Sequence, residues 1–312
     1  MKHILSAEQF EPAQLATLFS EADVFRQADL SIGSRREVMG THYGRIMLSM
    51  FYEPSTRTRF SFEIAATKLG IGVVGTENGS EFSSAAKGET VEDTANVFNE
   101  FGVDAISMRT KEDGMAARAA AVSKIAILNG GDGVGEHPTQ AVLDLYTIQE
   151  HFGQLGGLKV VMAGDLKLGR TVRSLAKLLS LYPGNNISFL STPELQIGDD
   201  IKRQLTERGT MYHETSQTYD ALREADVVYW TRLQLERQAL GSDISIGQDH
   251  FVLDAKALEV IPKAAIIMHP LPRNKEIDTT VDNDPRAKYF RQAGNGLYIR
   301  MAMLDAIMNR LD

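Results

Sequence analysis

Short apolar runs that alternate with helical patterns constrain the fold of this chain more than any other feature. Uninterrupted apolar runs are typical of parallel strands buried on both faces, and the segments between them supply crossover helices. The expected strands are residues 45–51, 72–76, 105–108, 124–128, 160–163, 187–190, 227–229 and 266–268. Because 312 residues exceed one ordinary core, we expect an α/β fold of two domains, each a parallel sheet flanked by helices.

The domain junction is expected at a helix that Pro138 can begin, since proline is favoured at the first helical position. We expect a first domain at residues 1–137, a linking helix at 138–151 and a second domain at 152–295. The apolar-rich segment 296–312 is expected to form a last helix that packs back on the first domain.

The formal net charge is −8, from 33 basic and 41 acidic residues. Nucleic acids and membrane surfaces are polyanionic, so this balance argues against both as partners. The absence of cysteine excludes disulfides, thiolate zinc sites and cysteine nucleophiles. The N-terminus quickly turns polar, unlike a signal peptide, and no apolar run approaches the ~20 residues that span a bilayer. We expect a cytoplasmic enzyme without a cofactor or metal, in which an anion site is a local concentration of positive charge.

The strongest local signal is Ser-Thr-Arg-Thr-Arg at residues 55–59, between an expected strand and an expected helix. Backbone N–H groups at a helix start lack partners in the helix, and the helix dipole favours negative charge there. Hydroxyl and guanidinium groups add donors that suit phosphate oxygens. Helix capping by Ser55 or Thr56 would explain the hydroxyls but not two arginines, whose charge opposes the dipole. An anion site is therefore favoured over simple capping, with a bound anion or a carboxylate such as Glu53 balancing the arginines.

Three motifs together resemble those of the aspartate/ornithine transcarbamoylase family. They are Ser-Thr-Arg-Thr-Arg-Phe-Ser-Phe-Glu from residue 55, His-Pro-Thr-Gln from residue 137 and His-Pro-Leu-Pro-Arg from residue 269. The motifs stand in the family's order, and the resemblance covers nearly the whole chain. It implies that carbamoyl phosphate is a substrate and that the active site lies between the two domains. The resemblance assigns the binding of carbamoyl phosphate to Ser55, Thr56, Arg57, Thr58, Arg109, His137, Gln140, Pro270 and Leu271.

By the resemblance, Thr58, Arg109 and His137 act as catalytic groups that donate to the carbonyl oxygen. Negative charge grows on that oxygen when an uncharged amine attacks the carbamoyl carbon, and positioned donors stabilise it. A lone histidine near a helix start is more often structural. The anion site nearby, and Gln140 one turn along the same helix face, favour the functional interpretation of His137.

The acceptor is indicated by the second domain. Residues 164–171 nearly spell a phosphate-binding P-loop, but Arg170 stands where that motif needs lysine. The resemblance instead assigns Arg170 to the α-carboxylate of aspartate, and Arg232 and Gln234 to its side-chain carboxylate. Ornithine-specific members carry a Ser-Met-Gly loop and a cysteine in place of Pro270, which this chain lacks. Transfer to aspartate, giving N-carbamoyl-L-aspartate and phosphate early in pyrimidine biosynthesis, is favoured over ornithine or a ureido-type acceptor.

A polar loop at residues 77–87 reads, without the family pattern, as an ordinary flexible surface loop. The resemblance makes it a mobile loop whose Ser83 and Lys87 reach the active site of a neighbouring subunit. Lys87 would bind aspartate there. The implied assembly is a homotrimer with shared active sites.

The resemblance carries three further implications. Substrate binding would close the domains through bridges from Glu53 to Arg170 and Arg237, and the Leu271–Pro272 bond would be cis. A regulatory chain or another pyrimidine-pathway enzyme is compatible as a partner. The alternative from a different class, a dinucleotide-binding oxidoreductase, rests on the α/β pattern alone, since residues 130–135 lack the G-x-G-x-x-G spacing.

Overall fold

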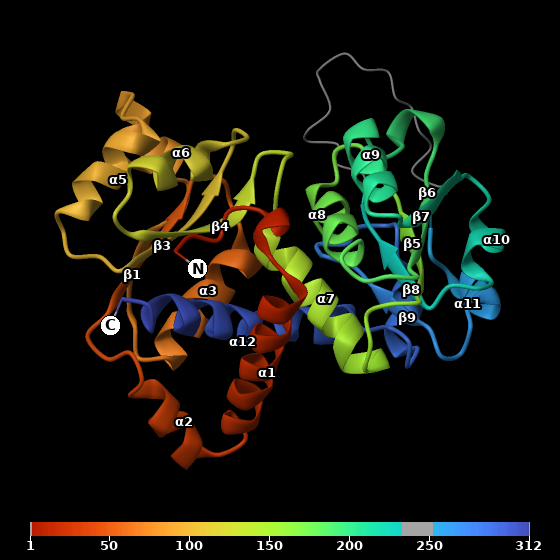
Figure 1. The fold of residues 1–312 in the computed structure, drawn as a ribbon, viewed down its shortest axis with the longest axis horizontal. Helices are drawn as coiled ribbons and strands as arrows, with labels where there is room; N and C mark the ends of the chain where they lie inside the picture. Colours follow the sequence, from red (N-terminus) through yellow and green to blue (C-terminus); the bar gives the residue numbers. More distant parts are fainter. Residues whose placement is uncertain (1, 233–251, 312) are drawn as a thin grey trace. The chain divides into compact units, whose positions relative to one another are not determined.

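Two parallel sheets form the framework of the computed structural model, which describes residues 2–232 and 252–311 (Figure 1). The chain divides into two compact units. Unit 1 runs to Val142 and resumes at Gly294, and unit 2 comprises Leu143–Ala293. The two divisions fall inside helices α7 (Pro138–Phe152) and α12 (Tyr289–Met308).

The sheet of unit 1 has four parallel strands in the order β2-β1-β3-β4. Its strands are β1 (Ile46–Phe51), β2 (Gly72–Thr76), β3 (Ala105–Thr110) and β4 (Ala126–Asp132). The central strands β1 and β3 are almost wholly buried, whereas β2 is an exposed edge strand. Strand β4 continues through two glycines to Asp132, beyond the expected end at residue 128.

Helices cover both faces of this sheet, with α5 and α6 on one side and α3 on the other (Figure 1). Leu48, Ile106 and Ile127 point toward α5 and α6 and form one core with Ala95 and Ala119 of those helices. The helices of unit 1 before α7 are η1 (Ala7–Gln9), α1 (Pro12–Ala28), α2 (Ile32–Met39), α3 (Thr56–Lys68), α4 (Gly79–Phe82), η2 (Ser84–Lys87), α5 (Val91–Asn99) and α6 (Met115–Val122).

The sheet of unit 2 has five parallel strands in the order β7-β6-β5-β8-β9. Its strands are β5 (Lys159–Ala163), β6 (Asn186–Leu190), β7 (Met211–Thr215), β8 (Val227–Trp230) and β9 (Ile266–Met268). Strand β7 was not expected from the sequence. It is a largely exposed edge strand, so it lacks the apolar run that identifies the buried strands.

Helices α8 and α9 lie on one side of this sheet, and α10 and α11 lie on the other (Figure 1). Val161, Val228 and Ile267 form a core with Leu222 of α10 and Ala257 of α11. The helices of unit 2 between α7 and α12 are α8 (Arg170–Leu179), η3 (Pro193–Leu195), α9 (Asp199–Glu207), α10 (Thr218–Leu222), α11 (Ala255–Val260) and η5 (Thr279–Asn283).

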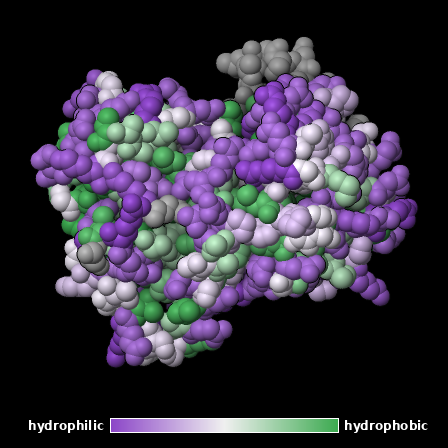
Figure 2. Space-filling model, in the orientation of Figure 1, coloured by the Kyte–Doolittle hydropathy of each residue, from purple (hydrophilic) through white to green (hydrophobic). Residues whose placement is uncertain are grey.

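The expected fold class, two parallel sheets flanked by helices, is confirmed. Helix α12 begins at Tyr289, earlier than the expected residue 296. The visible surface is mostly hydrophilic, with apolar residues in separate patches (Figure 2). Among residues 2–232 and 252–311, no helix is both long and apolar enough to cross a membrane.

Candidate active site

The loop between β1 and α3 begins the candidate site in unit 1. Ser55 is the N-cap of α3, with extended backbone at φ −157°, yet its side chain makes no capping hydrogen bond. Its hydroxyl oxygen instead accepts a hydrogen bond from Nη1 of Arg109 at 2.8 Å. Simple capping, the alternative considered from the sequence, therefore does not describe Ser55.

Arg109 reaches this loop because β1 and β3 are neighbours. It pairs in register with Phe51, the last residue of β1, and its carbonyl oxygen accepts from the Tyr52 amide at 2.9 Å. Its guanidinium lies between two partners, Ser55 and Glu53, with Nε at 3.3 Å from Oε2 of Glu53. A cation is thus held at the carboxyl end of the sheet, where ligands bind in open α/β folds.

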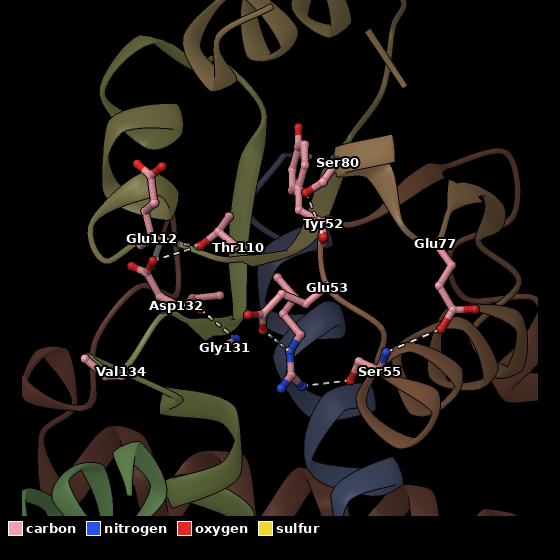
Figure 3. A network of polar contacts seen from close by, with 12 residues as sticks. Tyr52, Glu53, Ser55, Glu77, Ser80, Thr110, Glu112, Gly131, Asp132 and Val134 are labelled. Atoms are coloured by element: carbon pink, nitrogen blue, oxygen red, sulfur yellow. Dashed lines mark hydrogen bonds and ion pairs between the residues drawn. The ribbon is translucent and has the colours of Figure 1, made fainter. Parts of the chain in front are cut away.

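A second carboxylate, Glu77, meets the same loop from the end of β2. The backbone N–H of Ser55 donates to Oε1 of Glu77 at 3.3 Å, a contact drawn as a dashed line in Figure 3. Nη2 of Arg59 lies 3.3 Å from Oε2 of Glu77, and Glu63 is 3.8 Å from Nε of Arg59. Carboxylates thus balance the helix-start charge of Arg59, as the dipole argument requires.

The other members of the loop differ in exposure. Thr58 is buried, whereas Thr56 and Arg57 are exposed. Thr58 packs against the last part of β4, where a Cβ on Gly130 would lie 3.3 Å from Cγ2 of Thr58. The glycine therefore lets strand β4 approach the loop closely, and a larger residue there would push on Thr58.

His137 and Gln140 lie at the start of α7, within unit 1. The chain returns from β4 through a bridge between Asp132 and Glu136 and then enters the helix. His137 is buried, and its carbonyl oxygen accepts from the amides of Gln140 and Ala141, both at 3.1 Å. His137 is thus fixed to the first turn of α7, and Gln140 is half-buried one turn later.

The segment at residues 77–87 contains two short helices, α4 and η2. The hydroxyl of Ser83 donates to the carbonyl oxygen of Gly79 and accepts from the Ala85 amide at 3.2 Å. Lys87 is exposed at the end of η2. Within one chain, the Ser83 side chain is used inside the segment, while the Lys87 side chain faces solvent.

In unit 2, the loop between β5 and α8 meets the end of β8. A Cβ on Gly164 would lie 2.1 Å from the carbonyl oxygen of Thr231, and Gly164 has φ +110°, so only glycine fits there. Thr231 donates its hydroxyl to the Ala163 carbonyl at 2.9 Å. Arg170, buried at the start of α8, and Arg232 follow these two strands.

Two predicted site residues, Gln234 and Arg237, lie outside the described residues. The predicted bridges from Glu53 to Arg170 and Arg237 stay predictions. Within unit 1, Glu53 pairs with Arg109.

After β9 comes the segment His-Pro-Leu-Pro-Arg. The Leu271–Pro272 peptide bond is cis, as predicted, and Leu271 has a positive φ of 53°. His269 is buried, with Nε2 at 2.9 Å from Oε1 of Glu276. Arg273 forms an ion pair with Asp282 and donates to the Tyr289 hydroxyl at 3.1 Å.

Sequence reasoning missed two carboxylates that hold these loops, Glu77 and Glu276. A signal for Glu77 was present, because arginines at a helix start require a nearby anion and Glu77 follows the strand next to β1. No comparable local signal pointed to Glu276.

Two parallel sheets with polar loops at the carboxyl ends of their strands define the class of protein, a two-unit α/β protein with a candidate anion site in unit 1. The carbamoyl-phosphate-binding domain of the aspartate/ornithine carbamoyltransferases matches residues 2–150, and their aspartate/ornithine-binding domain matches residues 156–307. The chain belongs to the aspartate/ornithine carbamoyltransferase family.

Relatives across the family cover nearly the whole chain. The chloroplastic aspartate carbamoyltransferase of rice is 46% identical over 309 residues, which are 98% of this chain and 84% of the rice protein. The aspartate carbamoyltransferase catalytic subunit of Clostridium acetobutylicum is 42% identical over 290 residues, 93% of this chain and 94% of that subunit. The crystal structure of Trypanosoma cruzi aspartate transcarbamoylase with carbamoyl phosphate and aspartate superposes with a TM-score of 0.89 at 38% identity, covering 98% of this chain and 96% of that chain.

Proposed function

We propose that this enzyme transfers the carbamoyl group of carbamoyl phosphate to the α-amine of L-aspartate, giving N-carbamoyl-L-aspartate and phosphate. The observation that carries the proposal is the pairing of Arg109 with Ser55 at the start of α3, beside the hydroxyls and arginines of residues 56–59. These donors suit a phosphate group. The names of the relatives support the reaction and its acceptor.

In the proposed reaction a C–N bond forms and the bond between the carbamoyl carbon and the phosphate oxygen breaks. The attacking amine gives up one proton, which the leaving phosphate takes as it departs. Thr58, Arg109 and His137 donate to the carbonyl oxygen, on which negative charge grows in the tetrahedral species. Catalysis comes from positioning and charge stabilisation, without a covalent enzyme intermediate.

The proposed substrate contacts follow the family resemblance. Carbamoyl phosphate is bound by Ser55, Thr56, Arg57, Thr58, Arg109, His137, Gln140, Pro270 and Leu271. Aspartate is bound by Arg170, Arg232, Gln234 and Lys87. Two arginine side chains suit a dicarboxylate, because each guanidinium group can form a bidentate pair with one carboxylate. The ammonium group of a lysine cannot form such a pair.

An assay for carbamoyl-aspartate formation tests the function. With carbamoyl phosphate as donor, we expect aspartate to be carbamoylated and ornithine, at the same concentration, to be inert. Faster carbamoylation of ornithine would overturn the choice of acceptor. If neither aspartate nor ornithine were carbamoylated, the proposed carbamoyl transfer would be wrong.

We further propose a homotrimer in which Ser83 and Lys87 serve a neighbouring subunit's site. The exposed edge of β2, with Val74, and the exposed Phe60 and Ile64 of α3 support an interface on unit 1. Unpaired strand edges and exposed apolar residues favour association with another chain.

A mixing experiment tests the shared site. Lys87→Ala and Arg57→Ala are each expected to be nearly inactive, and hybrids reassembled from the two should regain activity at sites with one intact loop and one intact anion site. Native mass measurement verifies the hybrids. No recovery in verified hybrids, or a fully active monomer, would show that each chain completes its own site.

The cellular setting is also part of the proposal. Carbamoyl-aspartate formation is an early step of pyrimidine biosynthesis, and pyrimidine auxotrophy on deletion of the gene would test that role. The rice relative is named chloroplastic, so the cytoplasmic location expected from the sequence stays a prediction, which cell fractionation tests.

A further inference from the structure

Leu271 adopts a backbone conformation that its own side chain disfavours. Its φ of 53° lies in the left-handed region, which is uncommon for any residue other than glycine and costs free energy. Such a residue persists only where its surroundings hold it. The holding contact is a hydrogen bond from the Leu271 amide to Nδ1 of His269, at 2.8 Å.

This contact fixes the protonation of the His269 ring. A backbone N–H can only donate, so Nδ1 accepts and carries no proton. The proton of the neutral ring is then on Nε2, which donates to Oε1 of Glu276 at 2.9 Å. Burial pushes the pKa of the Glu276 carboxyl upward, but the hydrogen bond from His269 and others from the backbone outweigh it and hold that pKa below its usual value. Glu276 is therefore an ionised acceptor near neutral pH.

The ring is anchored on its main-chain side as well. The His269 amide donates to Oε1 of Gln292 at 2.9 Å, and Nε2 of Gln292 donates to Oδ1 of Asp144 at 2.6 Å. The Tyr229 hydroxyl donates to the other oxygen of Asp144 at 2.7 Å. All four residues are buried. These three hydrogen bonds are buried, and they restrict the position of the His269 backbone that carries the imidazole.

Glu276 secures the far end of the same segment. Its two carboxylate oxygens accept from the Asn274 amide at 3.1 and 3.0 Å, and its carbonyl oxygen accepts from the Leu253 amide at 2.9 Å. One histidine–glutamate pair thus fixes the backbone on both sides of Pro272.

We infer that His269 is a positioning residue for carbamoyl phosphate. Its unprotonated Nδ1 holds Leu271 in the left-handed conformation, and this directs the carbonyl oxygens of Pro270 and Leu271 at the carbamoyl NH₂ group. The inference rests on the proposed function, in which those two residues contact carbamoyl phosphate. His269 itself touches no substrate and acts only through the backbone.

The proposed role of His269 predicts different effects on the binding of two ligands that share one phosphate site, carbamoyl phosphate and inorganic phosphate. Carbamoyl phosphate has an NH₂ group that can donate to the two carbonyl oxygens, whereas inorganic phosphate has none. Loss of the backbone geometry should therefore weaken carbamoyl phosphate and leave inorganic phosphate unaffected. A general folding defect would weaken both.

Two substitutions isolate the role of Nδ1. In His269→Asn the side-chain Oδ1 stands at the same bond position from Cβ as Nδ1 and can accept from the Leu271 amide. His269→Leu keeps comparable bulk but offers no acceptor. We expect His269→Leu to raise the KM for carbamoyl phosphate about tenfold and lower kcat by a similar factor. The inhibition constant of inorganic phosphate should stay within twofold of wild type, and His269→Asn should restore most of the lost KM and kcat.

A matched control is available in unit 1, where His42 also pairs with a carboxylate. Its Nε2 lies 2.8 Å from Oδ1 of the partly exposed Asp305, and His42 is not one of the proposed substrate-binding residues. His42→Leu removes one histidine–carboxylate pair and should lower the thermal midpoint. The ratio of carbamoyl phosphate KM to phosphate inhibition constant should remain that of wild type.

Three outcomes would overturn the inference. They are a wild-type KM in His269→Leu, an equal KM increase in His269→Leu and His269→Asn, or a parallel weakening of phosphate in His269→Leu. Failure of the proposed function is distinguishable, because the wild-type enzyme would then form no carbamoyl-aspartate. In that event, a crystal structure of His269→Leu still tests the local claim, since Leu271 should leave the left-handed region.

Discussion

The loop from β1 to α3 in unit 1 and the loop from β5 to α8 in unit 2 are built alike. Each follows a central parallel strand and starts a helix that has arginine in its first turn. Neither helix is capped by its N-cap side chain, because Ser55 makes no capping hydrogen bond and the N-cap of α8, Gly169, has no side chain. The second loop even approaches a P-loop in sequence. Nonetheless, only the first is proposed to bind a phosphate group through its helix start.

The difference lies in the carboxylates. In the β5–α8 loop, Asp165 is fully buried, and its Oδ1 accepts from the Leu168 amide at 2.9 Å. The β1–α3 loop meets two partly exposed carboxylates, Glu53 and Glu77, on Arg109 and on the Ser55 amide. A buried carboxylate inside the loop keeps its hydrogen bond to the loop backbone whether or not an anion is near. A partly solvated carboxylate is displaced by a bound anion at a small cost in free energy. The position of the carboxylate, more than the glycine pattern, therefore distinguishes the two loops.

The largest expected effect is at Arg57. Arg57→Ala removes a cation from the proposed anion site, and we expect activity to fall by about 10²–10³-fold, with weaker phosphate binding and an unchanged fold. Phosphate affinity is measured by calorimetry. Lys167→Ala is the matched control, because Lys167 is an exposed cation in the β5–α8 loop. A wild-type phosphate affinity in Arg57→Ala, or a weaker phosphate affinity in Lys167→Ala, would contradict the proposed difference between the two loops.

Substitution of Arg232 tests whether unit 2 binds an anion through side chains instead of through a helix start. Arg232→Ala should lower kcat/KM for aspartate by about 10²-fold, because one desolvated charged contact is worth about 2–4 kcal/mol. The affinity for carbamoyl phosphate should stay close to wild type. Steady-state kinetics with each substrate varied separate the two effects, and an equal loss for both substrates would contradict the assignment.

Substitution of Asp165 tests whether this carboxylate stabilises the β5–α8 loop without affecting phosphate binding. Asp165→Ala leaves the Leu168 amide without its acceptor, and we expect the free energy of unfolding to fall by about 1–3 kcal/mol. Urea denaturation measures this loss, and Asp165→Asn, which retains an acceptor oxygen, should recover part of it. Phosphate binding should not change in either variant. Tighter phosphate binding in Asp165→Ala would mean that this loop is a masked anion site.

The smallest expected effect is at Glu77. Glu77→Gln removes a charge that competes for the Ser55 amide and Arg59, so phosphate should bind about two- to fivefold tighter, or about 0.5–1 kcal/mol. Glu63→Gln is the control, because Glu63 also lies near Arg59 but has no contact with the Ser55 amide. Weaker phosphate binding in Glu77→Gln would show that Glu77 supports the site and does not compete with the anion.

Local patterns predicted the buried parts of the fold. Pro138 does begin α7, as its position in the sequence predicted. Strand β9 has the expected bounds, 266–268. Strand β7 was missed because an edge strand needs no apolar run, and the end of β4 was missed because glycines in a strand read as a turn.

By itself, the sequence determined the α/β class, the motifs at strand ends and the local charge conflict at the start of α3. These follow from the spacing of residues along one element, which is a local property. Only the tertiary structure decided which carboxylate meets the start of α3, since the pairing of β2 with β1 brings Glu77 to the Ser55 amide and to Arg59. It also brought Nδ1 of His269 to the Leu271 amide, a contact between side chain and backbone that no local spacing predicts.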